Sequence, residues 1–318
     1  MKCVFVEKVN EVVVKDIPVP EINDDQVLIK MGLACICTKT DTHIIQGIYP
    51  AANPFPAFLG HEAAGTVVKV GKNVKDFKPG DRVAYKGETG VMAEYTAHTP
   101  DLMFKIPDSC SFEEAAMMEV SSCAYSLVRQ CVKPGDHVLI TGQGCAGTFG
   151  LIFAKLAGAT KIVVTDPSAF KRERSLRYGA DLALDPNEVD IVSEAKRLTD
   201  GKGFDVVMEF SGECKPMQQS VYCVRCQGTI GMFGVCCQPV PFDFLEFHCK
   251  FAQLIATGHE YAYNKVPYQK MLDFQEKGLV NFGDFVTHKF PFTDVQKGLD
   301  LIASGDETIL RIGLTPID

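Results

Sequence analysis

The stretch from Val138 to Asp166 constrains the fold of this chain more than any other part of its sequence. A short apolar run is followed by glycines in the order G-x-G-x-x-G, then by a helix-like segment, and then by a second apolar run that ends on an acidic residue. This order predicts a strand, a tight turn, a helix and a second strand. A chain built around such a unit is expected to form a doubly wound parallel α/β sheet.

Each part of this stretch has a physical role in binding a dinucleotide. Gly142 permits the tight turn, Gly144 lets a pyrophosphate approach the backbone, and Gly147 lets the helix pack closely on the strand. The helix N-terminus offers free N–H groups and a partial positive charge to the phosphates. Asp166 would accept hydrogen bonds from a ribose diol and repel a 2′-phosphate, which favours NAD over NADP. The alternative is a glycine-rich turn in another α/β unit.

The predicted secondary structure before this unit differs from that within and after it. Residues 1–100 contain short β-like runs separated by proline, glycine and asparagine, which indicates a small barrel-like β domain. A helical pattern follows over Ser111–Cys131. From Gly135 onward strand and helix patterns alternate, and the last strand of this series is expected at Gln253–Thr257. The C-terminal part adds two helical patterns and a closing strand.

Composition and charge exclude several classes of function. The 318 residues are enough for two domains, and a hydrophobic content of 46% with 23% charged residues is typical of a globular protein. A net charge of −8 argues against nucleic acid or an anionic membrane surface as the main partner. No apolar run approaches the roughly 20 residues that span a bilayer. The N-terminal segment lacks the apolar core of a signal peptide.

The cysteines indicate a reducing environment. There are 13 of them, an odd number, and no export signal precedes them, so we expect a cytoplasmic protein with mostly free thiols. Cys223 and Cys226 have the spacing of a metal-binding pair, but no second pair accompanies them. Packing within a helix-like stretch is the better interpretation of these two residues.

A second group of residues, in the first 120, has the chemistry of a metal site. Cys37, His61, Glu62 and Glu119 offer a thiolate, an imidazole and two carboxylates, which suit Zn²⁺. Three protein ligands would leave one position open for water or substrate. Each residue alone also has an ordinary explanation, because a lone cysteine usually packs in the core and Glu119 could lie on the surface of a helix.

An ordered series of motifs along the chain resembles the zinc-dependent medium-chain alcohol and polyol dehydrogenases, in particular the sorbitol and threonine dehydrogenases. The matching stretches, which include the glycine fingerprint and cover nearly the whole chain, are Ile36-Cys37 with Thr40-Asp41-x-His43, Gly60-His61-Glu62-x-x-Gly65, Lys78–Val83, Glu114–Glu119, Lys133-Pro134-Gly135-Asp136-x-Val138 and Phe204–Val207. Each motif is weak alone, and the ordered set is specific.

The resemblance implies both a fold and an activity. It implies a GroES-like β-barrel catalytic domain, residues 1–121 completed by 259–318, and a Rossmann domain of residues 122–258. The implied reaction is hydride transfer between NAD(H) and an alcohol or polyol, or the corresponding aldehyde or ketone. It further implies one catalytic zinc and a homodimer or homotetramer joined through the strand near Gln253–Thr257. The implied ligand pattern, with Glu119 as a possible ligand, favours a polyol or a secondary alcohol as the substrate.

Roles for individual residues also come from the resemblance. It implies that Cys37, His61 and either Glu62 or Glu119 bind the catalytic zinc. The metal's role is that of a Lewis acid that makes an alcohol easier to deprotonate. Thr40 matches a residue that touches the substrate oxygen, and His43 matches one that passes the proton to solvent.

Two further residues have implied roles near these. Asp41 matches a residue that supports the metal ligands. Arg311 matches a basic residue near the cofactor pyrophosphate.

The chain departs from the family pattern in two places. Two residues, Thr38 and Lys39, separate Cys37 from Thr40, where the family has one. Aligning on Thr40 would put Thr38 at the ligand position, but threonine is a poor zinc ligand, so we keep Cys37, with Cys35 as the remaining alternative. The four-cysteine lobe that binds a structural zinc in many relatives is missing after Val83, so no structural zinc is expected.

Two other functions compete with a zinc-dependent dehydrogenase. The first is a zinc-independent quinone or alkene reductase on the same scaffold. The presence of the metal-ligand candidates argues against it, because such a reductase needs no metal ligands. The second is a non-catalytic NAD-binding redox sensor, which the many cysteines would suit. Metal analysis and NAD-dependent turnover discriminate among the three.

Overall fold

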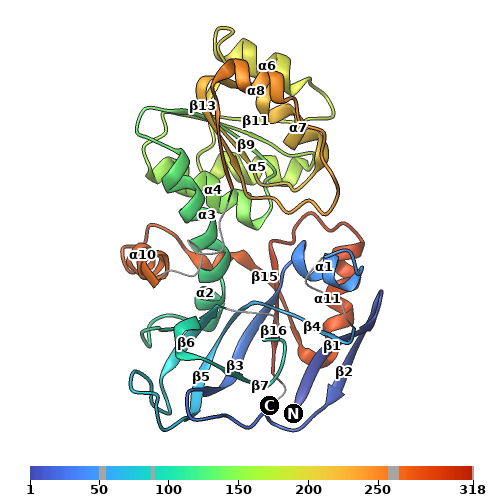
Figure 1. Ribbon diagram of the computed structural model, residues 1–318, viewed down its shortest axis with the longest axis vertical. Coiled ribbons are helices and arrows are strands. Elements are labelled where there is room, and N and C mark those ends of the chain that lie inside the picture. Colours follow the sequence, from blue (N-terminus) through green and yellow to red (C-terminus); the bar gives the residue numbers. More distant parts are fainter. Residues whose placement is uncertain (50–54, 87–89, 257–264, 317–318) are drawn as a thin grey trace. The chain divides into compact units, whose positions relative to one another are not determined.

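The computed structural model describes residues 1–49, 55–86, 90–256 and 265–316 (Figure 1). The chain divides into two compact units, Met1–Val120 with Tyr263–Asp318, and Ser121–Ala262. We call them the β unit and the α/β unit. Within the described ranges, no helix combines the length and the apolar character that crossing a membrane requires.

The β unit consists mainly of antiparallel strands. Those of its N-terminal part are β1 (Lys2–Lys8), β2 (Glu11–Asp16), β3 (Val27–Ile36), β4 (Ala57–Phe58), β5 (Glu62–Val70), β6 (Arg82–Lys86), β7 (Tyr95–His98) and β8 (Met103–Lys105). The C-terminal part adds β15 (Val286–Pro291) and β16 (Arg311–Thr315). The helices are α1 (Thr40–Ile45), η2 (Pro100–Leu102), α2 (Phe112–Ala116), α10 (Lys265–Glu276), η3 (Phe282–Phe285), η4 (Phe292–Asp294) and α11 (Val295–Ala303).

The strands of the β unit form two sheets. A small sheet has the order β2-β1-β4, and a larger one the order β15-β16-β3-β5-β6-β8, with β7 also paired to β3. Buried apolar side chains from both sheets, among them Val6, Ile29, Val83 and Ile312, form one core. The C-terminal strand β16 pairs with β3 and so completes the sheet begun by the N-terminal part.

The predicted helix over Ser111–Cys131 is divided into two. Ser111 forms the expected capping box with Glu114 and starts α2. α2 ends at Ala116, and the N–H of its C-cap residue Met117 donates to the carbonyl oxygens of Ala115 and, at 3.4 Å, of Glu113. α3 (Met118–Cys131) begins at the next residue. One continuous helix was therefore the wrong prediction, although the start and end of the helical stretch are close to those found.

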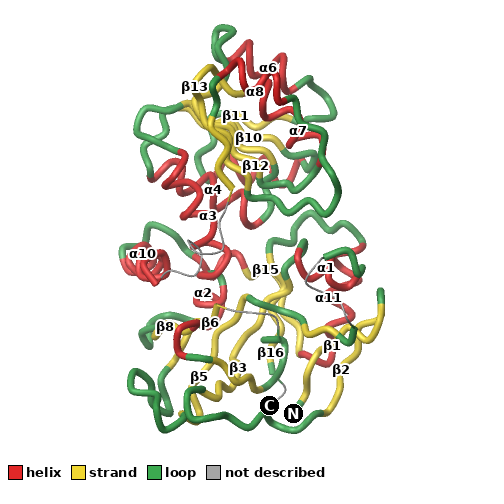
Figure 2. The backbone as a smooth tube through the Cα atoms, viewed as in Figure 1, coloured by secondary structure: helices red, strands yellow, loops and turns green. Residues whose placement is uncertain are grey.

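The α/β unit contains the predicted parallel sheet (Figure 2). Its strands have the order β11-β10-β9-β12-β13-β14, all parallel. They are β9 (His137–Thr141), β10 (Lys161–Thr165), β11 (Leu182–Leu184), β12 (Phe204–Glu209), β13 (Val224–Met232) and β14 (Gln253–Ala256). Thr257, the predicted end of the last strand, lies outside the described residues.

Helices connect these strands. They are α4 (Cys145–Leu156), α5 (Ala169–Arg177), α6 (Ile191–Leu198), α7 (Cys214–Cys223) and α8 (Phe244–Lys250). The first two pack against β9, β10 and β11, whereas α7 and α8 pack against β12 and β13 (Figure 1). The strand order reverses between β9 and β12, and ligands of such sheets bind beyond the carboxyl ends of the strands at that point.

Cys223 and Cys226 do not share a helix as predicted. α7 ends at Cys223, which is buried, and β13 begins at Val224, whose backbone is extended, so Cys226 is an exposed residue of a strand. The helix changes to a strand at Val224, where the backbone packs closely against Gly203: a Cβ atom added to Gly203 would come 2.7 Å from the carbonyl carbon of Val224. All 13 cysteines are free thiols.

Candidate metal centre and dinucleotide site

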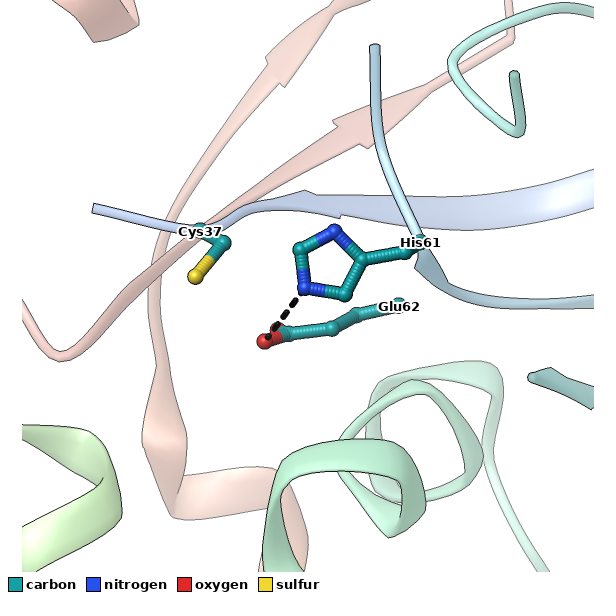
Figure 3. A group of neighbouring side chains, drawn as sticks. All are labelled: Cys37, His61 and Glu62. Carbon is teal, nitrogen blue, oxygen red and sulfur yellow. Dashed lines mark ion pairs between the residues drawn. The ribbon is translucent and has the colours of Figure 1, made fainter. Parts of the chain in front are cut away.

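Three of the predicted metal ligands lie together in the β unit. A sulfur, an imidazole nitrogen and a carboxylate oxygen of Cys37, His61 and Glu62 are all within 4.8 Å of one another (Figure 3). Nε2 of His61 is 3.9 Å from Oε1 of Glu62. His61 keeps 17% of its side chain exposed, whereas Cys37 and Glu62 are buried, so the group is open on the side of the histidine.

Strand register explains why residues so far apart in sequence meet. Cys35 on β3 pairs with Glu62 on β5, so the chain that leaves β3 at Cys37 passes the chain that enters β5 at His61. On the other side of β3, Ile36 pairs with Ile312 of β16, which places Arg311 next to Cys37. Two antiparallel pairings thus assemble the group.

Asp41 holds the backbone on both sides of the group. Its buried carboxylate accepts hydrogen bonds from the N–H of Cys37 at 2.7 Å and from the N–H of Gly60 at 3.2 Å. Oδ1 also lies 3.9 Å from Nδ1 of His61. Although these partners favour the charged form, burial dominates and raises the pKa of Asp41. Asp41 therefore holds the backbone beside two of the metal-ligand candidates, and the supporting role that the resemblance implies for it stays a prediction.

The extra residue after Cys37 is absorbed by a turn. Thr38 and Lys39 form this turn, and α1 starts at Thr40. The N–H of Asp41 still donates to the carbonyl oxygen of Cys37, so the helix is tied directly to the cysteine. This geometry places the sulfur of Cys37 in the group and explains how the longer spacing is tolerated.

Arg311 forms a buried ion pair within the same group. Its Nε and Nη2 donate to the two carboxylate oxygens of Glu62 at 2.8 and 2.9 Å, and Nη2 lies 3.8 Å from the sulfur of Cys37. A two-point arginine–carboxylate contact fixes orientation as well as charge. The predicted contact of Arg311 with a cofactor pyrophosphate remains a prediction.

The charges favour a thiolate beside a protonated histidine. Although burial opposes ionisation, Arg311 and the hydrogen bond with His61 lower the pKa of Cys37. Burial likewise favours a neutral His61, but the hydrogen bond with Cys37 and the charges of Cys37, Asp41 and Glu119 raise its pKa well above the usual value. Once His61 has given up its proton, a thiolate, an imidazole and a carboxylate at one place form a donor set that fits zinc.

The remaining predicted residues of the β unit lie on two helices. Thr40 and His43 are half-buried residues of α1, the helix that carries Asp41. Glu119 is in the first turn of α3 and is close enough to act electrostatically on His61. The catalytic roles of Thr40 and His43, and the choice between Glu62 and Glu119 as ligand, stay predictions.

The glycine fingerprint of the α/β unit has the expected local geometry. Gly142 adopts a positive φ of 85°, and Gly144 is the N-cap of α4. A Cβ added at Gly147 would come 1.9 Å from the carbonyl oxygen of Gly142, whereas one added at Gly144 would meet no atom within 4 Å. Gly147 is therefore required by packing inside the protein, and the space at Gly144 is open to a ligand.

Asp166 follows β10, as predicted, and is buried. Its carboxylate accepts hydrogen bonds from the N–H of Gln143 at 2.8 Å and the N–H of Ser168 at 2.9 Å. These bonds tie the end of β10 to the fingerprint loop. Arg172, on the helix α5 that follows, forms an ion pair with Asp185 at 2.7 Å.

Two positioning residues escaped the sequence analysis. Gln143, in the middle of the fingerprint, is fully buried; its side-chain oxygen accepts from the hydroxyl of Ser175, and its backbone oxygen accepts from Arg174. Glu209, at the end of β12, is also buried. The only available signals were a polar residue between two glycines and an acid at the end of an apolar strand.

Comparison with known proteins identifies the family. A model of zinc-binding dehydrogenases matches residues 145–275, and a model of the alcohol dehydrogenase GroES-like domain matches residues 23–108. L-threonine 3-dehydrogenase of Pyrococcus horikoshii is 31% identical over 91% of this chain and 91% of its own length. Sorbitol dehydrogenase of Bacillus subtilis is 29% identical over 99% of this chain and 97% of its own. Alcohol dehydrogenase TADH from Thermus sp. ATN1 has the same fold, with a TM-score of 0.89 at 24% identity and full coverage of both chains.

The chain therefore belongs to the zinc-binding dehydrogenases that carry an alcohol dehydrogenase GroES-like domain. The predicted fold class, a GroES-like domain with a parallel Rossmann sheet, is confirmed. The predicted family and oxidoreductase class are confirmed as well.

Proposed function

We propose that this protein transfers a hydride between NAD(H) and an alcohol or polyol, or the corresponding aldehyde or ketone, at a zinc ion held in the β unit. The observation that carries the proposal is the meeting of a thiol, an imidazole and a carboxylate within 4.8 Å, in a chain of the zinc-binding dehydrogenase family. Similarity to sorbitol and threonine dehydrogenases supports a polyol or secondary alcohol as substrate.

The side chains of the β unit have separate tasks in this proposal. Cys37, His61 and one carboxylate hold the zinc, which when bound supplies Lewis acidity near neutral pH. Asp41 keeps the backbone of the cysteine and of the loop before His61 in place through its two hydrogen bonds. The hydroxyl of Thr40 takes up the proton of the substrate alcohol as it releases its own, which passes through the nicotinamide ribose to an imidazole nitrogen of His43 and on towards solvent.

The carboxylate ligand is either Glu62 or Glu119. Both oxygens of Glu62 accept hydrogen bonds from Arg311, which fixes this carboxylate 3.9 Å from the histidine. Glu119 acts on the same histidine from α3. Glu62→Gln and Glu119→Gln form a matched pair, and the variant that loses zinc identifies the ligand. Because Glu62→Gln also removes the ion pair with Arg311, the thermal stability of this variant is measured alongside.

The α/β unit supplies the cofactor site. The open space at Gly144 and the N-terminus of α4 support binding of a pyrophosphate. The carboxylate of Asp166 supports a preference for NAD, because it would repel a 2′-phosphate. In this proposal the dinucleotide binds at the carboxyl ends of the strands, near Gly142 and Asp166.

One experiment tests the whole proposal. Purified protein is analysed for metal and assayed with NAD and NADP against alcohols, polyols and hydroxyamino acids. We expect about one zinc per chain and NAD-dependent oxidation of at least one polyol or secondary alcohol. A zinc-free protein that reduces quinones or activated alkenes would replace this function with the reductase alternative. NAD binding without turnover would favour the redox sensor.

We also propose a cytoplasmic homo-oligomer. The free state of the cysteines supports a reducing compartment. In the part of the chain that the structure describes, β14 is the last strand of its sheet, with Leu254 48% exposed. Phe244 and Leu245 of α8, and Phe251 in the segment before β14, are more exposed still. An apolar edge of this kind is normally covered. Leu254→Lys should lower the mass measured by analytical ultracentrifugation, and an unchanged mass would move the interface elsewhere.

A further inference from the structure

Two cysteine thiols meet in the α/β unit, outside the groups described above. Cys214 is the first residue of α7, directly after the turn that follows β12. Cys236 lies in the loop that follows β13. Their sulfur atoms are 3.6 Å apart, and both side chains are half-buried, so a small reagent can reach them from solvent.

We propose that Cys214 and Cys236 are an oxidation site, at which a hydroperoxide converts the two thiols into a disulfide that weakens dinucleotide binding. The formation of the disulfide depends only on the two thiols. The effect on binding rests on the proposed cofactor site of the same unit.

The geometry needs little movement to form the bond. A disulfide has an S–S distance of about 2.05 Å, so the sulfurs must approach by roughly 1.5 Å. Each cysteine has one side-chain rotation available for this, and the loop that carries Cys236 is not part of a strand or helix.

The chemistry balances with one hydroperoxide. One sulfur attacks a peroxide oxygen, the O–O bond breaks, and a sulfenic acid and water form. The second sulfur then attacks the first, the S–O bond breaks, and a second water leaves with the remaining thiol proton. In total, two thiols and one hydrogen peroxide give one disulfide and two waters, and two electrons pass from the sulfurs to the peroxide.

The two loops that carry the cysteines are joined to the glycine fingerprint. The buried carboxylate of Glu209, at the end of β12, accepts hydrogen bonds from the N–H groups of Ser211 and Gly212. The backbone of Ser211 lies directly against Gly142, since a Cβ atom added to Gly142 would come 2.7 Å from the backbone nitrogen of Ser211. The N–H of Gly234, in the second loop, donates to the carbonyl oxygen of Glu209 at 3.1 Å.

This connection gives the disulfide a route to the cofactor. The turn after β12 cannot move without displacing atoms that touch Gly142, because these contacts are tight. The strand order also reverses between β9 and β12, which is where a dinucleotide binds in such sheets. A bond that draws the two loops together therefore displaces the first glycine of the fingerprint and lowers dinucleotide affinity.

The test uses the full-length, zinc-loaded protein with hydrogen peroxide as the oxidant. After oxidation, free thiols are alkylated and disulfide-linked peptides are identified by mass spectrometry. NADH affinity is measured by fluorescence before oxidation, after oxidation and after treatment with dithiothreitol. Zinc content is followed throughout, so that oxidation of Cys37 is detected separately.

We expect a peptide that links Cys214 to Cys236 and a loss of NADH affinity of about tenfold, which dithiothreitol reverses. Cys214→Ser and Cys236→Ser should bind NADH normally when reduced and should not respond to peroxide. Cys237→Ser and Cys226→Ser are the matched controls, a neighbouring and an exposed cysteine, and should respond like the wild type.

Three results would overturn the inference: no linked peptide, an unchanged NADH affinity once the disulfide has formed, or the same loss of affinity in Cys214→Ser. If the reduced protein does not bind NADH at all, the proposed function fails. In that case the linked peptide still decides whether the two cysteines are an oxidation site.

Discussion

The two candidate sites of this protein are built in opposite ways. The dinucleotide site comes from one continuous stretch, in which Gly142, Gly144 and Asp166 follow one another through a single βαβ unit. The metal group comes from three segments far apart in sequence, joined by the pairing of β3 with β5 and with β16. A continuous site depends on local backbone geometry, whereas an assembled site depends on strand register. Substitutions should therefore damage the two sites independently.

The largest expected effect is the loss of the metal from the β unit. Cys37→Ser removes the thiolate, so zinc content should fall from about one per chain to near zero, and dehydrogenase activity with it. NADH affinity should stay within about twofold of the wild type, because the fingerprint lies in the other unit. Metal analysis and fluorescence titration measure both.

The matched control for this variant is Cys35→Ala. Cys35 is a buried residue of β3, two positions before Cys37, and the change should leave zinc in place. If Cys37→Ser keeps its zinc and Cys35→Ala loses it, the ligand assignment is wrong.

The next effect separates two glycines of the fingerprint. Gly144→Ala meets open space in the free protein, so its thermal stability should be unchanged, while NADH affinity should fall about 10- to 100-fold because the pyrophosphate must approach there. Gly147→Ala forces a methyl group against the carbonyl oxygen of Gly142 and should destabilise the protein by about 1–3 kcal/mol.

Thermal melts and NADH titrations, made side by side, check this pair. Zinc content should stay normal in Gly144→Ala. A stable Gly144→Ala variant with full NADH affinity would mean that the dinucleotide does not approach this glycine.

The same contrast explains what could be predicted from sequence. The fingerprint, its flanking strands and the acid at Asp166 are local, so periodicity and glycine spacing were sufficient to locate them. The metal residues were candidates by their donor chemistry and were assigned as ligands through family resemblance, because no local pattern reveals which strands pair. The ion pair between Glu62 and Arg311 depends on two strand registers at once, and the sequence offered a different partner for Arg311.

Buried polar contacts were the least predictable feature. Gln143 stands at a position of the fingerprint that any residue can occupy, and its contact with Ser175 needs the fold to bring α5 against the loop. The break between α2 and α3 at Met117 contains no proline or glycine from which it could have been predicted. In both cases the deciding interactions are tertiary, and they override local preference.

A smaller effect concerns cofactor choice in the α/β unit. Asp166→Ala should lower the ratio of NAD to NADP efficiency about tenfold, since the repulsion of a 2′-phosphate is lost. The change also removes the acceptor for the N–H groups of Gln143 and Ser168, so affinity for both cofactors should fall somewhat. Steady-state kinetics with both cofactors give the ratio. An unchanged ratio would contradict the role given to Asp166, and zinc content serves as the control.

The smallest effect is an acid sensitivity located in the β unit, away from the metal group. Burial lowers the pKa of His98 to about 4, and its ring contacts the hydroxyls of Tyr85 and Thr96. In the unfolded chain a histidine has a pKa of about 6.5 and binds a proton more readily. Protonation therefore favours unfolding, and stability is lost as the pH falls from about 6.5 towards 4.

The size of this effect follows from the two pKa values. Between pH 7 and pH 5.5, His98 alone should lower the free energy of unfolding by about 1 kcal/mol. His98→Gln keeps a polar side chain that does not titrate, so this part of the pH dependence should vanish. Urea unfolding of both proteins at the two pH values gives the change in the free energy of unfolding for each. Subtracting one change from the other removes the contribution of the other titrating groups. Equal pH dependence in the two proteins would mean that His98 is protonated as readily in the folded protein as in the unfolded chain.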